Sequence, residues 1–230
     1  MMVIANLLRD VGRRPVLKRD VPGEIEVYRI DYPQRIVGNQ RQRLLDSLMP
    51  VAASAFQQKE EGAFRKDVED HVFGYEGLLV ATNEQGVPVA FRMWEFIQLD
   101  FVAGTDILYL AGMCVHQAWQ RRGIGELLLQ YVLREDFRRS LPDAHAFGPL
   151  ALAPYVALRT QNPVMKCCFD RAIGDESYPR LMEREIPGDI ARVGQIVSNR
   201  LEDTHFDPET MISRGLYGHS LYGTSPTPPD

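Results

Sequence analysis

The chain of 230 residues contains only three cysteines, Cys114, Cys167 and Cys168. Because their number is odd and two of them are adjacent, they do not suit a disulfide framework, and we expect a reducing, cytoplasmic environment. No Cys-x-x-Cys or His-x-x-x-His pair occurs, and the five histidines are scattered. The sequence therefore predicts no metal site.

Long apolar runs and a strong charge of one sign are also missing. No apolar stretch reaches 18 residues, so we expect no transmembrane helix and no membrane partner. The formal net charge is −5 with acidic and basic residues well mixed, which argues against a nucleic-acid partner. Hydrophobic residues make up 45% of the chain, enough to build a full core. The length and composition favour one globular domain with extensions.

Hydrophobic periodicity divides the chain into alternating strands and helices. The expected strands are Ile25–Ile30, Gly77–Thr82, Val87–Leu99, Ile107–Val115 and Tyr155–Thr160. The expected helices are Arg35–Met49, Ala63–Phe73, Gly123–Arg139, one capped by Asn162 that runs to about Ala172, and Asp189–Leu201. Pro50 should end or kink the first of these helices, with Val51–Gln58 as its continuation. Residues 207–223 are rich in Gly and Tyr, and we expect them to form an extended arm.

Two features order the predicted sheet. The polar turn Asn83–Gly86 joins Gly77–Thr82 to Val87–Leu99, which indicates a hairpin. Ile107–Val115 carries apolar residues on both parities, which is typical of a strand buried on both faces. This strand is therefore expected to be central in the sheet.

The stretch Gln120–Gly125 (sequence QRRGIG) lies between that buried strand and the most clearly amphipathic helix. Glycines allow the backbone to approach a large anion closely, and the first amides of a helix lack internal partners and carry about half a positive charge. Arg121 and Arg122 add full charges. The chemistry suits a pyrophosphate.

The bare pattern [Gln/Arg]-x-x-Gly-x-[Gly/Ala] is weak, and its context strengthens it. The alternative is a tight turn between strand and helix whose glycines only relieve crowding. Leu128 stands where a dinucleotide-binding fingerprint needs a third glycine, and the Gly-Lys-Ser/Thr of a nucleotide-triphosphate loop is absent. The sequence therefore argues against a dinucleotide site and against a nucleoside-triphosphate site.

The run Met113–Leu129 resembles motif A of the Gcn5-related N-acetyltransferase (GNAT) superfamily, and the resemblance covers about residues 25–175. It implies a mixed α/β fold with a mostly antiparallel central sheet flanked by helices, here with a C-terminal extension. It also implies that acetyl-coenzyme A is the co-substrate and that no metal is needed. The resemblance places the following residues at the cofactor: Met113, Cys114, Val115, Gln120, Arg121, Arg122, Gly123, Ile124, Gly125, Glu126, Asn162 and Lys166.

The sequence departs from the family at the general acid. Many members carry a tyrosine early in the helix that Asn162 opens, and Phe169 stands at that place. Phenylalanine cannot donate a proton, so Tyr155 is our candidate, with Tyr178 or water as alternatives. Both tyrosines can equally serve packing. Catalysis by proximity alone needs no acid.

Four further residues have two readings each. Glu95 lies in an apolar strand and is a candidate general base acting through water; alternatively, it faces solvent at an edge. His116 can titrate near neutrality or can structure the loop backbone. Cys114 can be a nucleophile or a buried core thiol, and the second is favoured because no base is assigned beside it. Lys166 reaches a cofactor phosphate or is solvated.

These expectations combine into one reading: direct transfer of an acetyl group from acetyl-coenzyme A to a primary amine of a small molecule or peptide. The rival is a non-catalytic acyl-coenzyme A-binding sensor or scaffold, which Phe169 favours; an interaction protein without a cofactor is a third reading. The expected divisions are a catalytic domain at 1–185, a helix and arm at 186–224, and a disordered tail at 225–230. The arm is expected to cover the acceptor side or a second subunit, which would make a homodimer.

Overall fold

The computed structural model describes residues 5–12, 25–58, 60, 62–101, 106–135, 155–160, 162–174, 177–179 and 185–214. The chain divides into two compact units. The first contains residues 1–95 and 110–128, and the second contains residues 96–109 and 129–230. The tail at 225–230 and the predicted arm beyond residue 214 lie outside the described residues.

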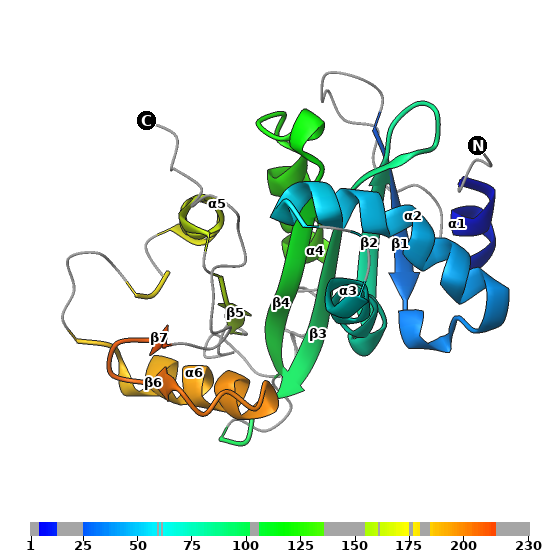
Figure 1. Cartoon of the computed structure of the whole chain (residues 1–230). Coiled ribbons are helices and arrows are strands. Elements are labelled where there is room, and N and C mark those ends of the chain that lie inside the picture. Colours follow the sequence, from blue (N-terminus) through cyan, green and yellow to red (C-terminus); the bar gives the residue numbers. More distant parts are fainter. Residues whose placement is uncertain are drawn as a thin grey trace, which may run out of the picture. The chain divides into compact units, whose positions relative to one another are not determined.

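Five strands form one sheet in the order β1-β2-β3-β4-β5 (Figure 1). They are β1 (Glu26–Asp31), β2 (Gly77–Thr82), β3 (Pro88–Gln98), β4 (Asp106–Val115) and β5 (Val156–Leu158). β1 pairs with β2 and β2 pairs with β3, both antiparallel. The predicted mixed α/β fold with a mostly antiparallel sheet is confirmed.

Four of the helices agree with predicted ones to within two residues where both are described, whereas the second runs past its predicted end at Met49 and the first was not predicted. They are α1 (Ala5–Val11), α2 (Gly38–Phe56), α3 (Gly62–Gly74), α4 (Ile124–Glu135), α5 (Pro163–Ile173) and α6 (Gly188–Arg200). Short 3-10 turns, η1 (Pro33–Arg35) and η2 (Gln117–Trp119), precede α2 and α4. No helix among these described residues combines the length and apolar character that a membrane crossing requires.

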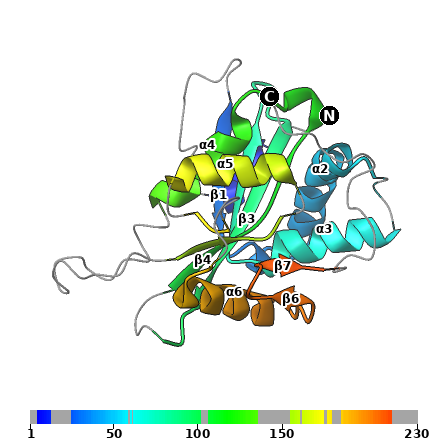
Figure 2. The ribbon, with the colours of Figure 1, turned by 90° about the vertical axis from the view of Figure 1, so that its left-hand side faces the viewer.

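One face of the sheet in the first unit packs against helices α1, α2 and α3. Alternate residues of each strand point to the same face, and this face contributes Tyr28, Ile30, Leu78, Val80, Phe91, Met93 and Cys114 to the core. α2 adds Leu44, Leu45, Leu48 and Met49. Figure 2 shows α2 and α3 on one side of the sheet and α4 on the other.

The opposite face of the same strands carries two buried arginines and a tryptophan. Arg29 is 6% exposed, Arg92 is 0% exposed and Trp94 is 1% exposed. The Arg29 guanidinium lies 4.9 Å from the Trp94 ring centroid, and its Nε donates to Asp31 Oδ1 at 2.7 Å. Gly77 of β2 is the direct cross-strand partner of Trp94. The indole therefore covers the place where a side chain at position 77 would lie.

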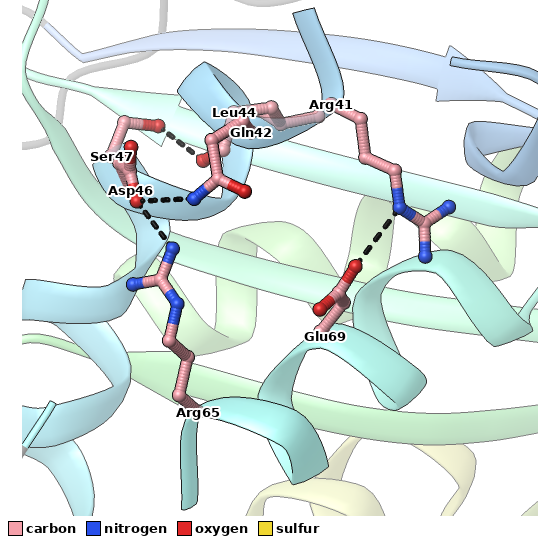
Figure 3. A network of polar contacts seen from close by, with 7 residues as sticks. All are labelled: Arg41, Gln42, Leu44, Asp46, Ser47, Arg65 and Glu69. Atoms are coloured by element: carbon pink, nitrogen blue, oxygen red, sulfur yellow. Dashed lines mark hydrogen bonds and ion pairs between the residues drawn. The ribbon is translucent and has the colours of Figure 1, made fainter. Parts of the chain in front are cut away.

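Polar contacts join α2 to α3 along their outer surfaces (Figure 3). Arg41 Nε donates to Glu69 Oε1 at 3.0 Å, and Arg65 pairs with Asp46. The Arg41 guanidinium also lies 3.9 Å from the Phe73 ring centroid. Such partly exposed pairs each contribute about 0–1 kcal/mol. They align the two helices more than they stabilise the fold.

Pro50 does not end α2. The helix continues past the proline and runs from Gly38 to Phe56. A proline inside a helix costs about 3 kcal/mol. Its neighbours Leu48, Met49, Val51 and Ala52 are all buried, and each large apolar side chain that is buried returns about 1.5–3 kcal/mol. Core packing outweighs the local preference.

Strand β4 is interior, but it is not the middle strand, because β3 takes that place. Ile107–Leu110 is buried on both parities, as predicted, whereas Ala111, Gly112, Met113 and Val115 are only partly buried. β5 has three residues against ten in β4. It is too short to pair along the whole length of β4.

The second unit contains the C-terminal residues that follow the resemblance. α6 contacts β5, and Arg192 of α6 lies 3.2 Å from Asp100 and 4.4 Å from the Phe101 ring centroid. A short hairpin, β6 (Phe206–Asp207) and β7 (Ile212–Ser213), packs back onto α6. A Cβ at Gly194 would lie 2.7 Å from Phe206 Cζ. The predicted amphipathic helix is present.

The carboxylate of Asp203 holds this hairpin in place. Its side chain is 1% exposed and accepts hydrogen bonds from the His205 backbone N–H at 3.0 Å and from the Ser213 hydroxyl. Arg159 Nη1, just after β5, lies 3.7 Å away. One buried group thus joins the end of β5, the residues after α6 and the hairpin.

Replacing Asp203 with alanine should lower the free energy of unfolding by about 2 kcal/mol, because buried donors lose their acceptor. Chemical denaturation of the full chain measures this loss. Asp207→Ala is the matched control, since Asp207 caps an exposed turn in the same hairpin through Glu209 and Thr210. Equal losses for the two variants would contradict a special role for Asp203.

Candidate active site

The end of β4 is anchored to two neighbouring elements of the first unit. His116 N–H donates to Val89 O of β3 at 2.9 Å, and Gln117 N–H donates to Ser54 Oγ of α2 at 3.0 Å. His116 Nδ1 accepts from Ala118 N–H at 3.2 Å and caps η2. The histidine therefore structures the backbone, the second of its two readings.

Gln120 fixes the Gln120–Gly125 loop to the strand. Its side-chain Nε2 donates to Val115 O at 3.0 Å, and its backbone N–H donates to Gln117 O at 3.2 Å. The amide side chain closes the loop back on the last residue of β4. Gln120 thus sets the loop geometry whether or not a ligand is bound.

Two residues of the loop adopt the left-handed conformation, Arg121 with φ 61° and Gly123 with φ 76°. Left-handed residues alternating with others turn successive N–H groups toward one side, which forms an anion-binding concavity. A Cβ built at Gly123 would meet nothing within 4 Å, and Arg121, Arg122 and Gly123 are exposed. The loop can receive a large anion at the start of α4.

Arg122 is held at the rim of the loop by an aromatic ring. Its guanidinium lies 4.8 Å from the ring centroid of Trp119 in η2. Such stacking keeps the charge near the loop without neutralising it. Glu126 is exposed in the first turn of α4, where a negative side chain is favourable to the helix dipole and would compete with a bound anion.

Gly125 is packed more closely than Gly123. Its φ is not in the left-handed region, and a Cβ there would lie 2.7 Å from Met113 Cε. The glycine therefore allows α4 to pack closely on β4, and its contact with the cofactor stays a prediction. Ile124 is also 1% exposed. Its side chain belongs to the core, and only its backbone N–H can serve a ligand.

Cys114 is a core thiol. It is 5% exposed, and burial raises its pKa to about 12. A thiol with that pKa stays protonated at neutral pH, and only the thiolate is a strong nucleophile. The buried reading holds. Its neighbours Met113 and Val115 are half-buried, and contacts of their backbone with a cofactor stay predictions.

Glu95 is buried at 5% exposure, so the solvated reading was wrong. It follows Trp94 in β3 and alternates with it, which places Glu95 on the same face as Phe91 and Met93. The surrounding apolar core makes an ionised carboxylate costly. β3 has almost no exposed position. The alternation of side chains along this strand therefore does not identify a face that is open to solvent.

Tyr155 lies in the second unit and its hydroxyl is engaged. The phenol donates to Asp189 Oδ2 of α6 at 2.8 Å, and its backbone carbonyl accepts from Leu108 N–H of β4 at 2.8 Å. Burial, and next the hydrogen bond and charge of Asp189, raise the pKa of Tyr155 to about 12. It is a weaker acid than an ordinary tyrosine. Phe169 is buried.

Asn162 and Lys166 also have partners within the second unit. Asn162 Oδ1 accepts from Val164 N–H at 2.9 Å and caps α5, as predicted. Lys166 Nζ lies 2.5 Å from Asp170 Oδ1 and 3.5 Å from Ser177 Oγ. The loop residues and Glu95 belong to the first unit. Cofactor contacts by Asn162 and Lys166 stay predictions.

Arg92 is a notable residue that the sequence analysis overlooked. It is 0% exposed, and its Nη1 donates to Met113 Sδ at 3.5 Å. Nε and Nη2 have no hydrogen-bond partner among the described residues. Burial lowers its pKa to about 10. The available signal was a lone cation in the apolar run from Val89 to Trp94.

Within the described residues, no three His, Cys, Asp or Glu side chains gather in a way that could hold a metal ion. The Gln120–Gly125 loop, by its own geometry, fits an organic anion. The left-handed Arg121 and Gly123, the open space at Gly123 and the two exposed arginines are the observations behind this fit.

Comparison with protein families matches part of the chain to one family model. Residues 74–158 match the model described as "Acetyltransferase (GNAT) domain". Similar solved structures include an aminoglycoside N-acetyltransferase in complex with CoA, at 15% identity and TM-score 0.45, covering 74% of this chain and 99% of that one. An aminoglycoside acetyltransferase from an uncultured soil metagenomic sample, in complex with sisomicin, has 13% identity and TM-score 0.47, with coverage of 71% and 95%. A ribosomal-protein-alanine N-acetyltransferase from Brucella melitensis biovar Abortus 2308 has 14% identity and TM-score 0.45, with coverage of 71% and 98%. No curated protein sequence matches the chain.

Proposed function

Because residues 74–158 carry a GNAT acetyltransferase domain, we propose that the protein transfers an acetyl group from acetyl-coenzyme A to a primary amine. The observation that carries this proposal is the exposed Gln120–Gly125 loop, with its left-handed Arg121 and Gly123 at the start of α4. The acceptor is a small-molecule or peptide amine. The transfer is direct and uses no covalent enzyme intermediate.

Different residues of the chain are proposed to bind the co-substrate and to accept the proton of the amine. The loop amides, with Arg121 and Arg122 beside them, bind the diphosphate of the co-substrate. The end of β4 at Met113–Val115 offers backbone groups to its pantetheine arm. When bound, the thioester supplies the acetyl group. Glu95 is the proposed general base, which accepts a proton from the acceptor amine through water.

Two proton donors to the leaving thiolate are considered, Tyr155 and solvent. Tyr155 is the proposed candidate in place of Phe169, yet its hydroxyl donates to Asp189 and its pKa is raised to about 12. An acid this weak protonates a thiolate poorly, which favours solvent as the donor. The engaged Tyr155 and the buried Phe169 also support the second candidate function, a coenzyme A-binding module without turnover. Thioester consumption with a panel of amines separates the two.

Gly123→Val should reduce the affinity for acetyl-coenzyme A about tenfold or more, which corresponds to about 1.4 kcal/mol. A β-branched residue resists the left-handed backbone, and its side chain would project where the diphosphate binds. Isothermal titration calorimetry measures this loss.

Gly174→Val is the matched control. Gly174 has the same φ of 76° and the same open surroundings, but it lies at the C-terminal cap of α5. Both variants place valine at a positive φ, so each should lose stability, whereas only Gly123→Val should lose affinity. Wild-type affinity in Gly123→Val, or equal loss of affinity in both variants, would sink the proposed role of the loop.

A further inference from the structure

Arg92 is a buried positive charge inside the first unit, and it has no ion pair among the residues that the structure describes. Its side chain is fully buried, and two of its three guanidinium nitrogens lack hydrogen-bond partners among the described residues. The third, Nη1, reaches only the thioether of Met113, a weak acceptor. Burying an ion in this way is costly unless something compensates for it.

The other buried arginine on the same face shows what compensation looks like. Arg29 pairs with Asp31 at 2.7 Å and stacks on Trp94. Arg92 forms no ion pair with any described carboxylate, although it lies in the same sheet two strands away. Since the fold provides a counter-charge for one arginine and none for the other, the charge of Arg92 is available to something else.

Arg92 lies beneath the anion-binding end of α4. The Met113 thioether receives Nη1 of Arg92 at 3.5 Å, and the same sulfur would lie 3.5 Å from a Cβ at Gly125 in the first turn of α4. One methionine side chain therefore separates the guanidinium from the helix start. The first turn of α4 is itself positive, so an unpaired cation below it is unfavourable until an anion arrives.

We propose that Arg92 is a buried positioning cation that attracts the diphosphate of the co-substrate to the Gln120–Gly125 loop from beneath α4. This rests on the proposed function. Arg92 does not touch the ligand; it acts through space and keeps Met113 against Gly125. A bound diphosphate supplies the missing counter-charge, and it relieves the repulsion between Arg92 and the helix dipole.

Two physical consequences distinguish Arg92 from the surface arginines. A charge in the protein interior is screened weakly by salt, whereas exposed charges are screened strongly. With a pKa of about 10, Arg92 stays charged at neutral pH. Its attraction should therefore persist at high ionic strength, where the contributions of the exposed Arg121 and Arg122 fade.

The test compares two ligands on the full chain. Arg92→Met fills the same space without charge, and it should weaken coenzyme A binding about tenfold, as expected for one unit charge at intermediate dielectric. It should leave binding of S-acetylpantetheine, which lacks the diphosphate, unchanged. The tenfold loss should be the same at 50 mM and 500 mM salt, whereas the loss in Arg122→Gln should shrink. Calorimetry measures each affinity.

Arg92→Lys keeps the charge and should retain most of the ratio between the two affinities. Thermal melting should show Arg92→Met to be as stable as wild type, because replacing an unpaired buried ion with an apolar side chain removes a cost. Should Arg92→Met not fold, Arg92→Gln makes the same comparison. An unchanged affinity ratio in the neutral variants would overturn the inference alone. Absence of coenzyme A binding in wild type would overturn the proposed function as well.

Discussion

Replacing Gly77 with alanine should lower the free energy of unfolding by about 3 kcal/mol. The added Cβ would lie 2.1 Å from two carbons of the Trp94 indole, a separation that no side chain can adopt without movement. Trp94 is 1% exposed and carries Arg29 on its ring, so it cannot swing into solvent. Denaturant unfolding of the full chain measures the loss.

Gly74→Ala provides the matched control for this variant. Gly74 ends α3 three residues earlier, and a Cβ there would meet nothing within 4 Å. Alanine should be neutral or slightly stabilising at that position, because it is the better helix former. Replacing Trp94 with leucine in the Gly77→Ala background should recover part of the loss. A Gly77→Ala protein as stable as Gly74→Ala would refute the steric argument.

Replacing Glu95 with glutamine should reduce kcat/KM about 100-fold or more, the range for loss of a general base. The amide has nearly the shape of the carboxylate but cannot accept a proton from the amine. The KM for acetyl-coenzyme A should stay near the wild-type value. Steady-state kinetics at one fixed pH measures both constants.

Glu69→Gln is the comparison for this variant, since Glu69 is a partly exposed residue of α3 whose partner is Arg41. It should retain nearly full turnover. If Glu95→Gln also kept full kcat/KM, Glu95 would be a structural residue and the base would have to be sought elsewhere. A loss of thermal stability in Glu95→Gln that parallels the loss of activity would also indicate a structural role for Glu95.

The features that the sequence predicted well are local ones. The turn at Asn83–Gly86, the N-cap at Asn162 and the helix after Gly123 each depend on a few neighbouring residues. Asn83 illustrates this, because its side chain accepts from the Gln85 and Val87 N–H groups within the turn. The resemblance to the GNAT family rests on one such local motif, and the domain match confirms it.

The features that the sequence did not reveal depend on neighbours far along the chain. Glu95 and Arg92 are charged residues in a strand, and alternation normally assigns such residues to a solvent face. Here α2 and α3 cover one face of the first-unit sheet and α4 covers the other (Figure 2), so both residues are buried. Pro50 is tolerated for the same reason, since buried neighbours outweigh its local cost. A glycine inside a strand can mark a close approach, so Gly77 offered a signal.

The two glycines of the loop, Gly123 and Gly125, are favoured for different physical reasons. The first position has a left-handed backbone, which favours glycine over residues that carry a β-carbon. The second is limited only by the far end of Met113, a flexible side chain that can move by an ångström. An alanine at position 125 would fit after a small movement of the Met113 side chain. The pattern [Gln/Arg]-x-x-Gly-x-[Gly/Ala] thus records two unlike constraints, one of conformation and one of volume, and positions 113 and 125 should vary together.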